Sequence, residues 1–324
     1  MQVSPSVRAV QVPDANPMHP DFTNIYLVGK GQVLSIDSGE AMDRYKWMLR
    51  GYLAAVEKSE IALAAITHHH ADHSGNLKWV REELKAEIVT HKKGVPLLKG
   101  RLPRTGVRTF ADNEVIDLDA GLNVRVLNAP GHSVDSVVFY IEEEGVLFSG
   151  DTMLGSSTTT VHDLGDYRRS LKMLAALPNL KVICPGHGPL IHDPAARIQQ
   201  YIRHRDMREG QIMNILGKGG VWSSWDIMLQ MYPDIDKRLR RAADNNVRVH
   251  LAQLEAEGRL TVYAGKPRKP NAARIQRDIE HGREREFLLK QAKKAQAEQR
   301  RAEVRAQENP PTGEWLEPPR YELN

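Results

Sequence analysis

A short stretch rich in histidine and aspartate constrains this chain more than any other feature of its sequence. It directly follows the apolar residues 61–66 and has the spacing H-x-H-x-D-H, with candidate metal ligands at His68, His70, Asp72 and His73. If residues 61–66 form a strand that continues into the histidines, the two that are two positions apart face the same way. The loop beyond can then turn the other two toward a second metal. Imidazole nitrogens and carboxylate oxygens are standard zinc donors, so the stretch predicts a metal site where a strand ends.

Three later junctions between a strand and a loop each end in a further candidate ligand. His132 and His187 each follow a Pro-Gly pair, and Asp151 follows the apolar residues 145–148 within the sequence Ser-Gly-Asp. A single histidine run can arise by chance. Ligands at several separate junctions indicate instead that the fold brings distant parts of the chain into one site.

These motifs occur in the order H-x-H-x-D-H, G-H-S, S-G-D and P-G-H-G, and in this order they resemble the metallo-beta-lactamase superfamily of two-metal hydrolases. The resemblance extends from about residue 20 to about residue 195. It implies an αββα sandwich with the metals at one edge of two packed sheets. Carried over to this chain, it places one metal on His68, His70 and His132 and a second on Asp72, His73 and His187, with Asp151 bridging both.

The implied cofactors are two zinc ions per chain. Iron or a mixed pair is compatible with the same ligands, because metal selectivity depends on supply as well as on ligand type. A zinc-bound water has a pKa of about 7 instead of about 15.7, so a hydroxide that bridges the metals is expected to attack a carbonyl or phosphorus atom. Asp72 is expected to orient this hydroxide and relay its proton. The predicted enzyme is a metal-dependent hydrolase with Asp72 and Asp151 as catalytic carboxylates.

Several polar residues outside the ligand set are expected to have supporting roles. Asp37 follows a predicted strand and is interpreted as a support for the metal loops rather than as a ligand. His69 lies between two ligands and is expected to point the opposite way. His162 and Asp163 are interpreted either as the wall of the substrate cleft or as ordinary loop residues. Tyr201 is predicted either to reach that cleft or to lie on a solvated helix face.

Patterns of apolar residues predict alternating strands and helices over the catalytic part. The expected strands are residues 25–28, 33–39, 61–66, 87–90, 123–127, 137–141, 145–148 and 181–184, and the expected helices are residues 43–58, 77–85 and 168–177. The predicted fold class is therefore α/β, and the catalytic domain is expected to span residues 1–195.

Beyond residue 195 the pattern becomes helical. Helices are expected at residues 195–216, 224–231 and 235–258, followed by a strand at residues 259–263. Two helices followed by a strand after a glycine are the outline of a winged helix, which we assign to residues 196–264. Residues 265–324 are rich in Ala, Glu, Lys, Gln and Arg, and they are expected to form a basic tail that is helical or disordered.

Part of the chain also resembles a narrower group. The sequences D-T-M-L-G at 151–155 and P-G-H-G-P at 185–189, with residues 199–205, resemble the beta-lactamase-like protein 2 group, which carries a winged helix after the catalytic domain. Its members are similar to a mitochondrial endoribonuclease that acts on single strands and, in other branches, to thioesterases of polyketide pathways. The resemblance therefore leaves two substrate classes open.

The charge distribution bears on this choice. The net charge of +4 lies in residues 265–324, since basic and acidic residues balance over the rest of the chain. The catalytic part thus has no bulk positive charge for nucleic acid, and we favour a small thioester or ester substrate over single-stranded RNA. A winged-helix nucleic-acid binder with a vestigial hydrolase domain is a third hypothesis, and the complete ligand set argues against it.

Composition also gives expectations about compartment and partners. The chain has one cysteine, Cys184, and no run of about twenty apolar residues, so neither an internal disulfide nor a membrane-spanning helix is expected. Residues 1–18 lack the apolar core of a signal peptide. We expect a cytoplasmic protein with no membrane partner, whose winged helix acts as a lid over the pocket or as the contact of a homodimer.

Overall fold

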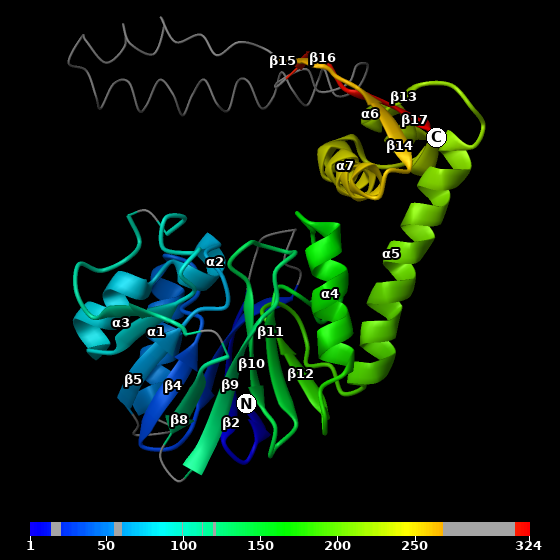
Figure 1. Cartoon of the computed structure of the whole chain (residues 1–324). Helices are drawn as coiled ribbons and strands as arrows, with labels where there is room; N and C mark the ends of the chain where they lie inside the picture. Colours follow the sequence, from blue (N-terminus) through cyan, green and yellow to red (C-terminus); the bar gives the residue numbers. More distant parts are fainter. Residues whose placement is uncertain (14–20, 55–59, 99, 112, 119–120, 268–314) are drawn as a thin grey trace, which may run out of the picture. The chain divides into compact units, whose positions relative to one another are not determined.

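The computed structural model describes residues 1–13, 21–54, 60–98, 100–111, 113–118, 121–267 and 315–324. The chain divides into two compact units, Met1–His204 and Arg205–Asn324, which Figure 1 shows coloured along the sequence. The first unit contains all seven candidate metal ligands, and the second contains the predicted winged helix.

Seven strands form the first sheet of the first unit, in sequence order. They are β1 (Gln2–Ser4), β2 (Val7–Pro13), β3 (Phe22–Val28), β4 (Gln32–Ile36), β5 (Glu60–Ala65), β6 (Glu87–Thr90) and β7 (Val107–Thr109). Pairing is antiparallel from β1 to β4 and parallel from β4 to β7. Because parallel strands end at the same edge of a sheet, the residues that follow β4, β5 and β6 meet there.

The second sheet of this unit has the strand order β12-β11-β10-β9-β8. Its members are β8 (Val115–Leu118), β9 (Leu122–Asn128), β10 (Val137–Ile141), β11 (Val146–Gly150) and β12 (Val182–Pro185). Strand β10 is antiparallel to β9 and β11, whereas β11 and β12 are parallel. Strands β9, β11 and β12 therefore run in one direction, and each is followed by a candidate ligand.

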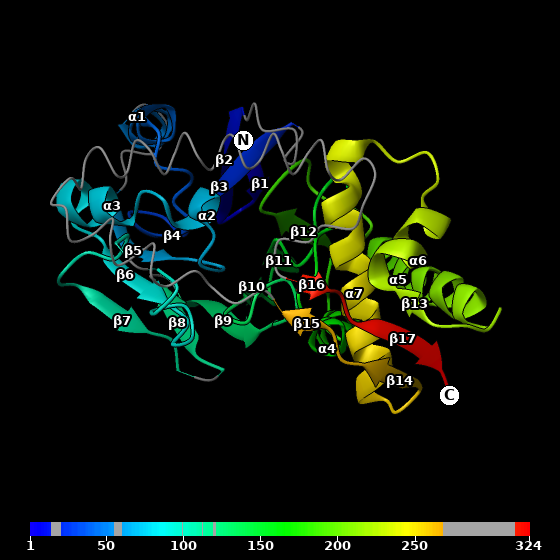
Figure 2. The same cartoon turned by 90° about the horizontal axis from the view of Figure 1, so that it is seen from above.

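An apolar core joins the two sheets, and helices cover their outer faces. These are α1 (Asp43–Tyr52), α3 (Leu77–Leu84) and α4 (Leu164–Ala175). The short helix α2 (Ala71–Ser74) carries Asp72 and His73, and α5 (Pro194–Leu216) begins in this unit and ends in the second. Tyr26 of the first sheet and Phe148 of the second meet edge to face, with ring centroids 5.2 Å apart. Helices α1 and α3 lie beside the first sheet (Figure 2). Tyr45 of α1 and Val80 of α3 are buried in a second apolar cluster with residues of this sheet. Tyr167 of α4 is buried beside the second sheet and donates to the Thr152 carbonyl at 2.7 Å. The predicted αββα sandwich is confirmed.

The second unit is a winged helix with its own apolar core. It contains the end of α5, the helices α6 (Ser224–Met231) and α7 (Arg240–Ala256), and the strands β13 (Trp222–Ser223), β14 (Leu260–Tyr263), β15 (Lys266–Pro267), β16 (Trp315–Glu317) and β17 (Arg320–Leu323). Ile227 of α6 and Leu251 of α7 are fully buried in this core. Ser223 caps α6, because its hydroxyl accepts from the Asp226 backbone and the Asp226 carboxylate accepts in return.

The expectation of a helical or disordered tail over residues 265–324 is wrong at both ends of that range. Residues 266–267 pair with residues 315–317 as β15 and β16, and β17 is the central strand of the sheet β13-β17-β14. The last residues of the chain thus belong to the winged helix. The middle of the predicted tail, residues 268–314, lies outside the described residues.

Smaller differences concern the edges of the sandwich. Strands β1 and β2, which complete the first sheet, were not predicted from the sequence, and neither were β7 and β8. The helix expected at residues 43–58 forms as α1 and ends at Tyr52, and residues 55–59 lie outside the described range. The predicted domain boundary after residue 195 falls inside α5, and the two compact units divide later in the same helix, after His204.

Candidate metal centre

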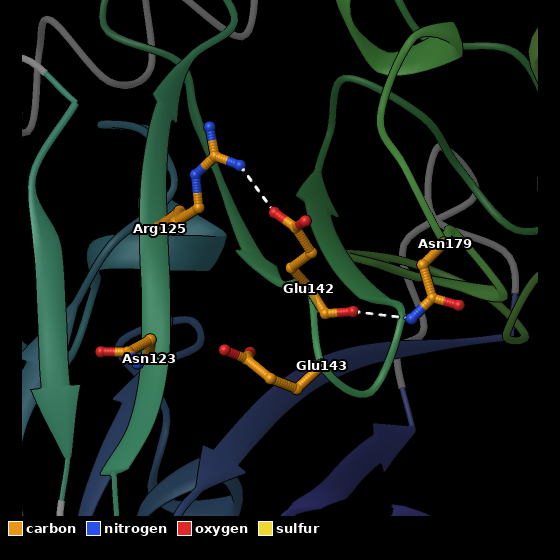
Figure 3. A pocket seen from close by; sticks show the side chains of 5 residues that line it. All are labelled: Asn123, Arg125, Glu142, Glu143 and Asn179. Carbon is orange, nitrogen blue, oxygen red and sulfur yellow. Dashed lines mark hydrogen bonds and ion pairs between the residues drawn. The ribbon is translucent and has the colours of Figure 1, made fainter.

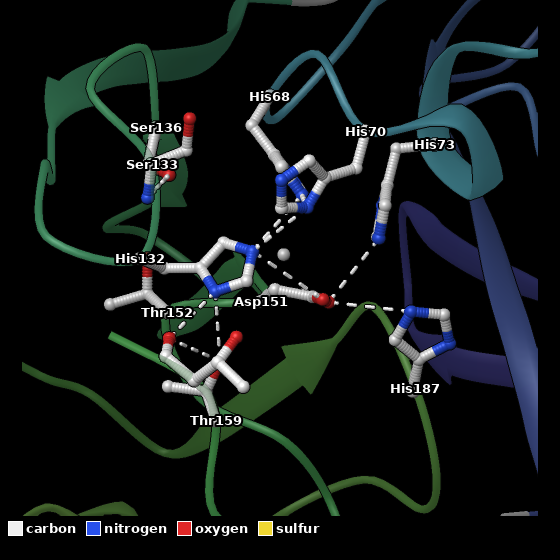
Figure 4. Close-up of polar contacts among 12 residues, drawn as sticks. His68, His70, His73, His132, Ser133, Ser136, Asp151, Thr152, Thr159 and His187 are labelled. Atoms are coloured by element: carbon white, nitrogen blue, oxygen red, sulfur yellow. Dashed lines mark hydrogen bonds and ion pairs between the residues drawn. The ribbon is translucent and has the colours of Figure 1, made fainter. Parts of the chain in front are cut away.

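Three histidines and one aspartate form a first group of candidate ligands at the common edge of the two sheets (Figure 4). His68 Nε2 lies 2.8 Å from His70 Nδ1, and His132 Nε2 lies 3.2 and 3.1 Å from these two nitrogens. The Oδ2 atom of Asp151 is 3.7 Å from His132 Nε2. Four potential donors therefore converge on one point, as in a zinc site.

A second group lies directly beside the first. The Oδ2 atom of Asp72 is 3.1 Å from His187 Nε2 and 3.7 Å from His73 Nε2. The other carboxylate oxygen of Asp151, Oδ1, is 3.3 Å from His73 Nε2 and 3.5 Å from His187 Nε2. Asp151 thus turns one oxygen toward each group. The structure brings all seven predicted site residues together in the predicted grouping, while their ligation of a metal stays a prediction.

Glycines in the ligand motifs allow this convergence. A Cβ on Gly186 would stand 2.6 Å from a ring atom of His73 and 2.7 Å from Asp151 Oδ1. A Cβ on Gly150 would stand 2.6 Å from the side chain of Thr67, and the φ of Gly150 is +48°, which L side chains rarely adopt. The glycines of the S-G-D and P-G-H-G motifs are therefore required by packing around the ligands.

Asp37 orients a ligand of each group, His73 directly and His68 through Thr67. It is buried at the end of β4, and its Oδ2 accepts from His73 Nδ1 at 2.7 Å. Its Oδ1 accepts from the Thr67 backbone N–H at 2.8 Å. The Thr67 hydroxyl lies 3.0 Å from Asp37 Oδ2 and 3.0 Å from His68 Nδ1. These contacts place the imidazole protons on Nδ1 and leave Nε2 of each ring free to bind a metal. The expected supporting role of Asp37 agrees with this geometry.

Two further imidazoles are oriented in the same manner. His132 Nδ1 is 2.9 Å from the Thr160 carbonyl oxygen and 3.0 Å from the Thr159 hydroxyl. His187 Nδ1 is 3.0 Å from the hydroxyl of Thr23. These threonines were not predicted from the sequence, because a threonine next to a loop has no distinctive sequence pattern.

The environment keeps the three histidines of the first group uncharged. Burial, followed by the nearby His73 and His132, lowers the pKa of His68 well below its usual value. Burial and His132 likewise lower the pKa of His70 to about 4. Both imidazoles are therefore neutral at pH 7, which is the form that binds a metal.

In the second group, the surrounding carboxylates favour a positive charge. Burial disfavours a charged His73, but the carboxylates of Asp37, Asp151 and Asp72 outweigh burial and raise its pKa. Burial similarly opposes ionisation of Asp72, but His73 and the hydrogen bond with His187 hold its pKa well below the usual range. His73 Nε2 and Asp151 Oδ1 are buried and have no hydrogen-bond partner among the described residues. A divalent cation would satisfy both atoms, so the residues fit a metal.

Residues next to the ligands have other partners. His69 is not among the clustered donors, and its Nδ1 lies 2.8 Å from Asp135 Oδ1. Asp163 caps α4 by accepting from the Asp166 backbone at 2.7 Å, and His162 is exposed. Tyr201 is fully buried and donates to the Ser157 carbonyl at 2.7 Å. It therefore fixes the loop after Asp151 instead of lying on a solvated helix face.

A separate surface hollow of about 530 Å³ lies at the other end of the second sheet (Figure 3). It is lined by Asn123, Arg125, Glu142, Glu143 and Asn179. Arg125, in the middle of β9, pairs with Glu142 at 2.9 Å. Glu142 directly follows β10, and Asn123 is near the start of β9, at the end of these strands opposite the loop that carries His132. The hollow is therefore not part of the metal centre. Separately, none of the helices in the described part of the chain is long and apolar enough to cross a lipid bilayer.

Comparisons with known proteins agree with this architecture. Residues 19–187 match the metallo-beta-lactamase superfamily, and residues 223–266 match the beta-lactamase associated winged helix domain. A beta-lactamase-like protein 2 homolog from Caenorhabditis elegans is 35% identical over 242 residues, which cover 73% of this chain and 79% of that protein. An atrochrysone carboxyl ACP thioesterase from Aspergillus fumigatus is 34% identical over 211 residues, which cover 64% of each protein.

Solved structures show the same fold. A metallo-beta-lactamase family protein from Thermus thermophilus superposes with a TM-score of 0.66 at 25% identity, over 80% of this chain and 96% of that one. Together with the matches in sequence and the cluster of histidines and aspartates, this likeness establishes the family and the reaction class. The chain belongs to the metallo-beta-lactamase superfamily and is a metal-dependent hydrolase with an associated winged-helix domain.

Proposed function

We propose that this chain is a dinuclear zinc hydrolase that acts on a small thioester or ester. The observation that carries the proposal is the position of Asp151. Its Oδ2 faces the histidines of the first group, and its Oδ1 faces His73 and His187 of the second. A carboxylate shared between two complete donor groups is suited to hold two cations side by side.

Each residue has a defined task in this proposal. His68, His70 and His132 would hold one cation, and Asp72, His73 and His187 the other, with Asp151 between them. When bound, the cations supply Lewis acidity at the scissile bond and lower the pKa of water toward neutrality. Asp72 is ionised at neutral pH, so its carboxylate would accept a hydrogen bond from the attacking water and orient it.

The open side of the centre supports access by a substrate. His70 and Asp72 are half-buried, whereas His68, His73 and His187 are almost completely buried. A substrate would therefore approach past His70 and Asp72. The preference for a thioester is supported by the Aspergillus relative named as a thioesterase and by the balanced charge of the chain outside residues 265–324.

The test is hydrolysis of a panel of acyl-CoA and acyl-pantetheine thioesters by the zinc-loaded full chain. We compare the parent with Asp151→Ala and with a matched control, Asp117→Ala, whose side chain is exposed on β8 away from the ligands. Metal content is measured by elemental analysis on the same samples. We expect two zinc ions per chain in the parent and the control. We also expect thioester turnover in both and its loss in Asp151→Ala.

Fluorogenic single-stranded RNA is assayed in parallel, at low and high salt. Cleavage of RNA that depends on Asp151, with no turnover of any thioester, would show that the substrate class is wrong while the two-metal chemistry stands. A parent that binds no more than one metal ion would contradict the dinuclear site itself.

A further inference from the structure

A buried carboxylate outside the ligand set links three loops around the first ligand group. Asp135 is 1% exposed, and its Oδ1 accepts from His69 Nδ1 at 2.8 Å and from the Ser133 hydroxyl at 2.5 Å. The Ser133 hydroxyl is also 3.2 Å from His69 Nδ1. His69 lies between two candidate ligands of the first group, and Ser133 directly follows the third, His132.

The third loop is the one that follows β6. The other oxygen of Asp135, Oδ2, is buried and has no hydrogen-bond partner among the described residues. A Cβ on Gly94 would stand 2.6 Å from this oxygen, so Asp135 fits only because residue 94 has no side chain. A buried carboxylate with one oxygen unsatisfied is costly, so its presence at this position needs an explanation.

We infer that Asp135 is a positioning residue for the first metal site alone. It ties the loop that carries His68 and His70 to the loop that carries His132, and these are the only segments among the described residues that supply nitrogen donors to the first group. Among the described residues, no hydrogen bond joins Asp135 to His73 or His187 of the second group, and Asp37 and Thr23 orient these two histidines instead.

Because Asp135 contacts only the loops of the first ligand group, its removal should affect metal binding at the first site only. Without Asp135, His69 and Ser133 lose their shared acceptor, and the distance between His132 and the two histidines of the metal loop is no longer fixed. Residues that orient metal ligands through hydrogen bonds typically contribute 10–100-fold to metal affinity. We therefore expect Asp135→Ala to weaken zinc binding about 10–100-fold at the first site and to leave the second site unchanged.

The inference rests on the proposed two-metal site, so the experiment measures each site separately. In a His187→Ala background only the first group keeps all its donors, and in a His132→Ala background only the second does. Zinc affinity of each full-length background is measured by competition with a chromophoric chelator, with and without Asp135→Ala. The readout is metal binding, so no substrate needs to be known.

Three further variants test whether the hydrogen bond and the position of Asp135 determine zinc affinity at the first site. Asp135→Asn keeps an acceptor for His69 and should restore most of the affinity. Gly94→Ala leaves every polar group of the cluster in place but displaces Asp135, so it should weaken the first site as well. Thr23→Val removes only the hydroxyl beside His187, so it should show the opposite pattern and weaken the second site alone.

The outcomes distinguish the positioning role of Asp135 from the proposed two-metal function. Loss of affinity in the His187→Ala background alone, with recovery in Asp135→Asn, supports the inference. Equal losses in both backgrounds would show that Asp135 only stabilises the fold, and no loss in either would show that it positions nothing. If the parent binds two zinc ions and Asp135→Ala has no effect, only this inference fails. If the parent and the His187→Ala background bind none, the proposed function fails with it.

Discussion

Replacing Asp37 by Asn should weaken the second metal site by switching the tautomer of one ligand. Asp37 has a φ of +66°, a left-handed conformation that asparagine tolerates better than alanine, so the substitution keeps the backbone. The carboxylate has two acceptors, one for the Thr67 backbone N–H at 2.8 Å and one for His73 Nδ1 at 2.7 Å. The asparagine amide has only one acceptor oxygen and one donor nitrogen.

Of the two groups that contact residue 37, the Thr67 backbone N–H can only donate, whereas the His73 imidazole can change its tautomer. The backbone N–H of Thr67 always carries its proton, so the amide oxygen is expected to face Thr67 and the amide nitrogen to face His73. His73 then accepts at Nδ1 and carries its proton on Nε2, which is the atom directed at Asp72 and Asp151. Metal binding must reverse this arrangement and leave a buried donor unpaired.

The magnitude follows from the hydrogen bond that metal binding breaks. Leaving a buried donor unsatisfied costs about 1–3 kcal/mol, and about 1.4 kcal/mol corresponds to a factor of ten in affinity. Zinc should therefore bind about 5–150-fold more weakly at the second site. The first site should be nearly unaffected, because the amide oxygen still accepts from Thr67, whose hydroxyl contacts His68.

The assay is the same chelator competition, with Asp37→Asn in the His132→Ala and His187→Ala backgrounds. The weakening should occur in the His132→Ala background, where only the second group is complete. Thermal unfolding of the metal-free variants serves as a control for folding. Equal weakening at both sites would refute the argument, since it would mean that Asp37 supports the loops generally and that the tautomer of His73 does not matter.

Three other predictions follow from the same structure. Asp151→Ala should release metal from both sites and lower hydrolysis about 10²–10³-fold or more, as measured by elemental analysis and turnover; retention of both ions would contradict a bridging role. The metal-free protein should lose stability as the pH falls from 6.5 toward 4 in urea titrations, because the pKa of His70 is lowered to about 4 and the unfolded chain takes up the proton first; a flat profile would count against this burial. Deleting residues 320–324 should destabilise the second unit by about 2–4 kcal/mol, since Tyr321 and Leu323 pack on its core, and should leave the metal content unchanged.

The sequence predicted the ligand set well because each ligand lies in a short motif at the end of an apolar strand. His132 and His187 could be found from the Pro-Gly pair before each, and the structure explains part of that signal, since Gly186 must lack a side chain beside His73. The supporting residues were harder to predict. Thr23, for example, contacts His187 across more than 160 positions of the chain, and no local pattern records such a contact.

The sheet edges were missed for a different reason. The residues of β2 are buried on both faces, so they lack the alternation of apolar and polar residues that identifies a half-exposed strand. Strand β1 is only three residues long, which is too short for any periodicity.

The error at the C-terminus has the clearest physical basis. Strands β14 and β17 pair directly, with Leu260 opposite Leu323 and Tyr263 opposite Arg320, although a long charged segment separates them in the sequence. Each doubling of loop length adds only about 0.6 kcal/mol to the entropic cost of closing the loop, so a separation of this length costs about 2 kcal/mol more than a tight turn. The packing of Tyr321 and Leu323 against the core of the winged helix can offset a cost of this size. Composition therefore identifies the charged segment, but it does not show that β17, which follows this segment, belongs to the winged helix that precedes it.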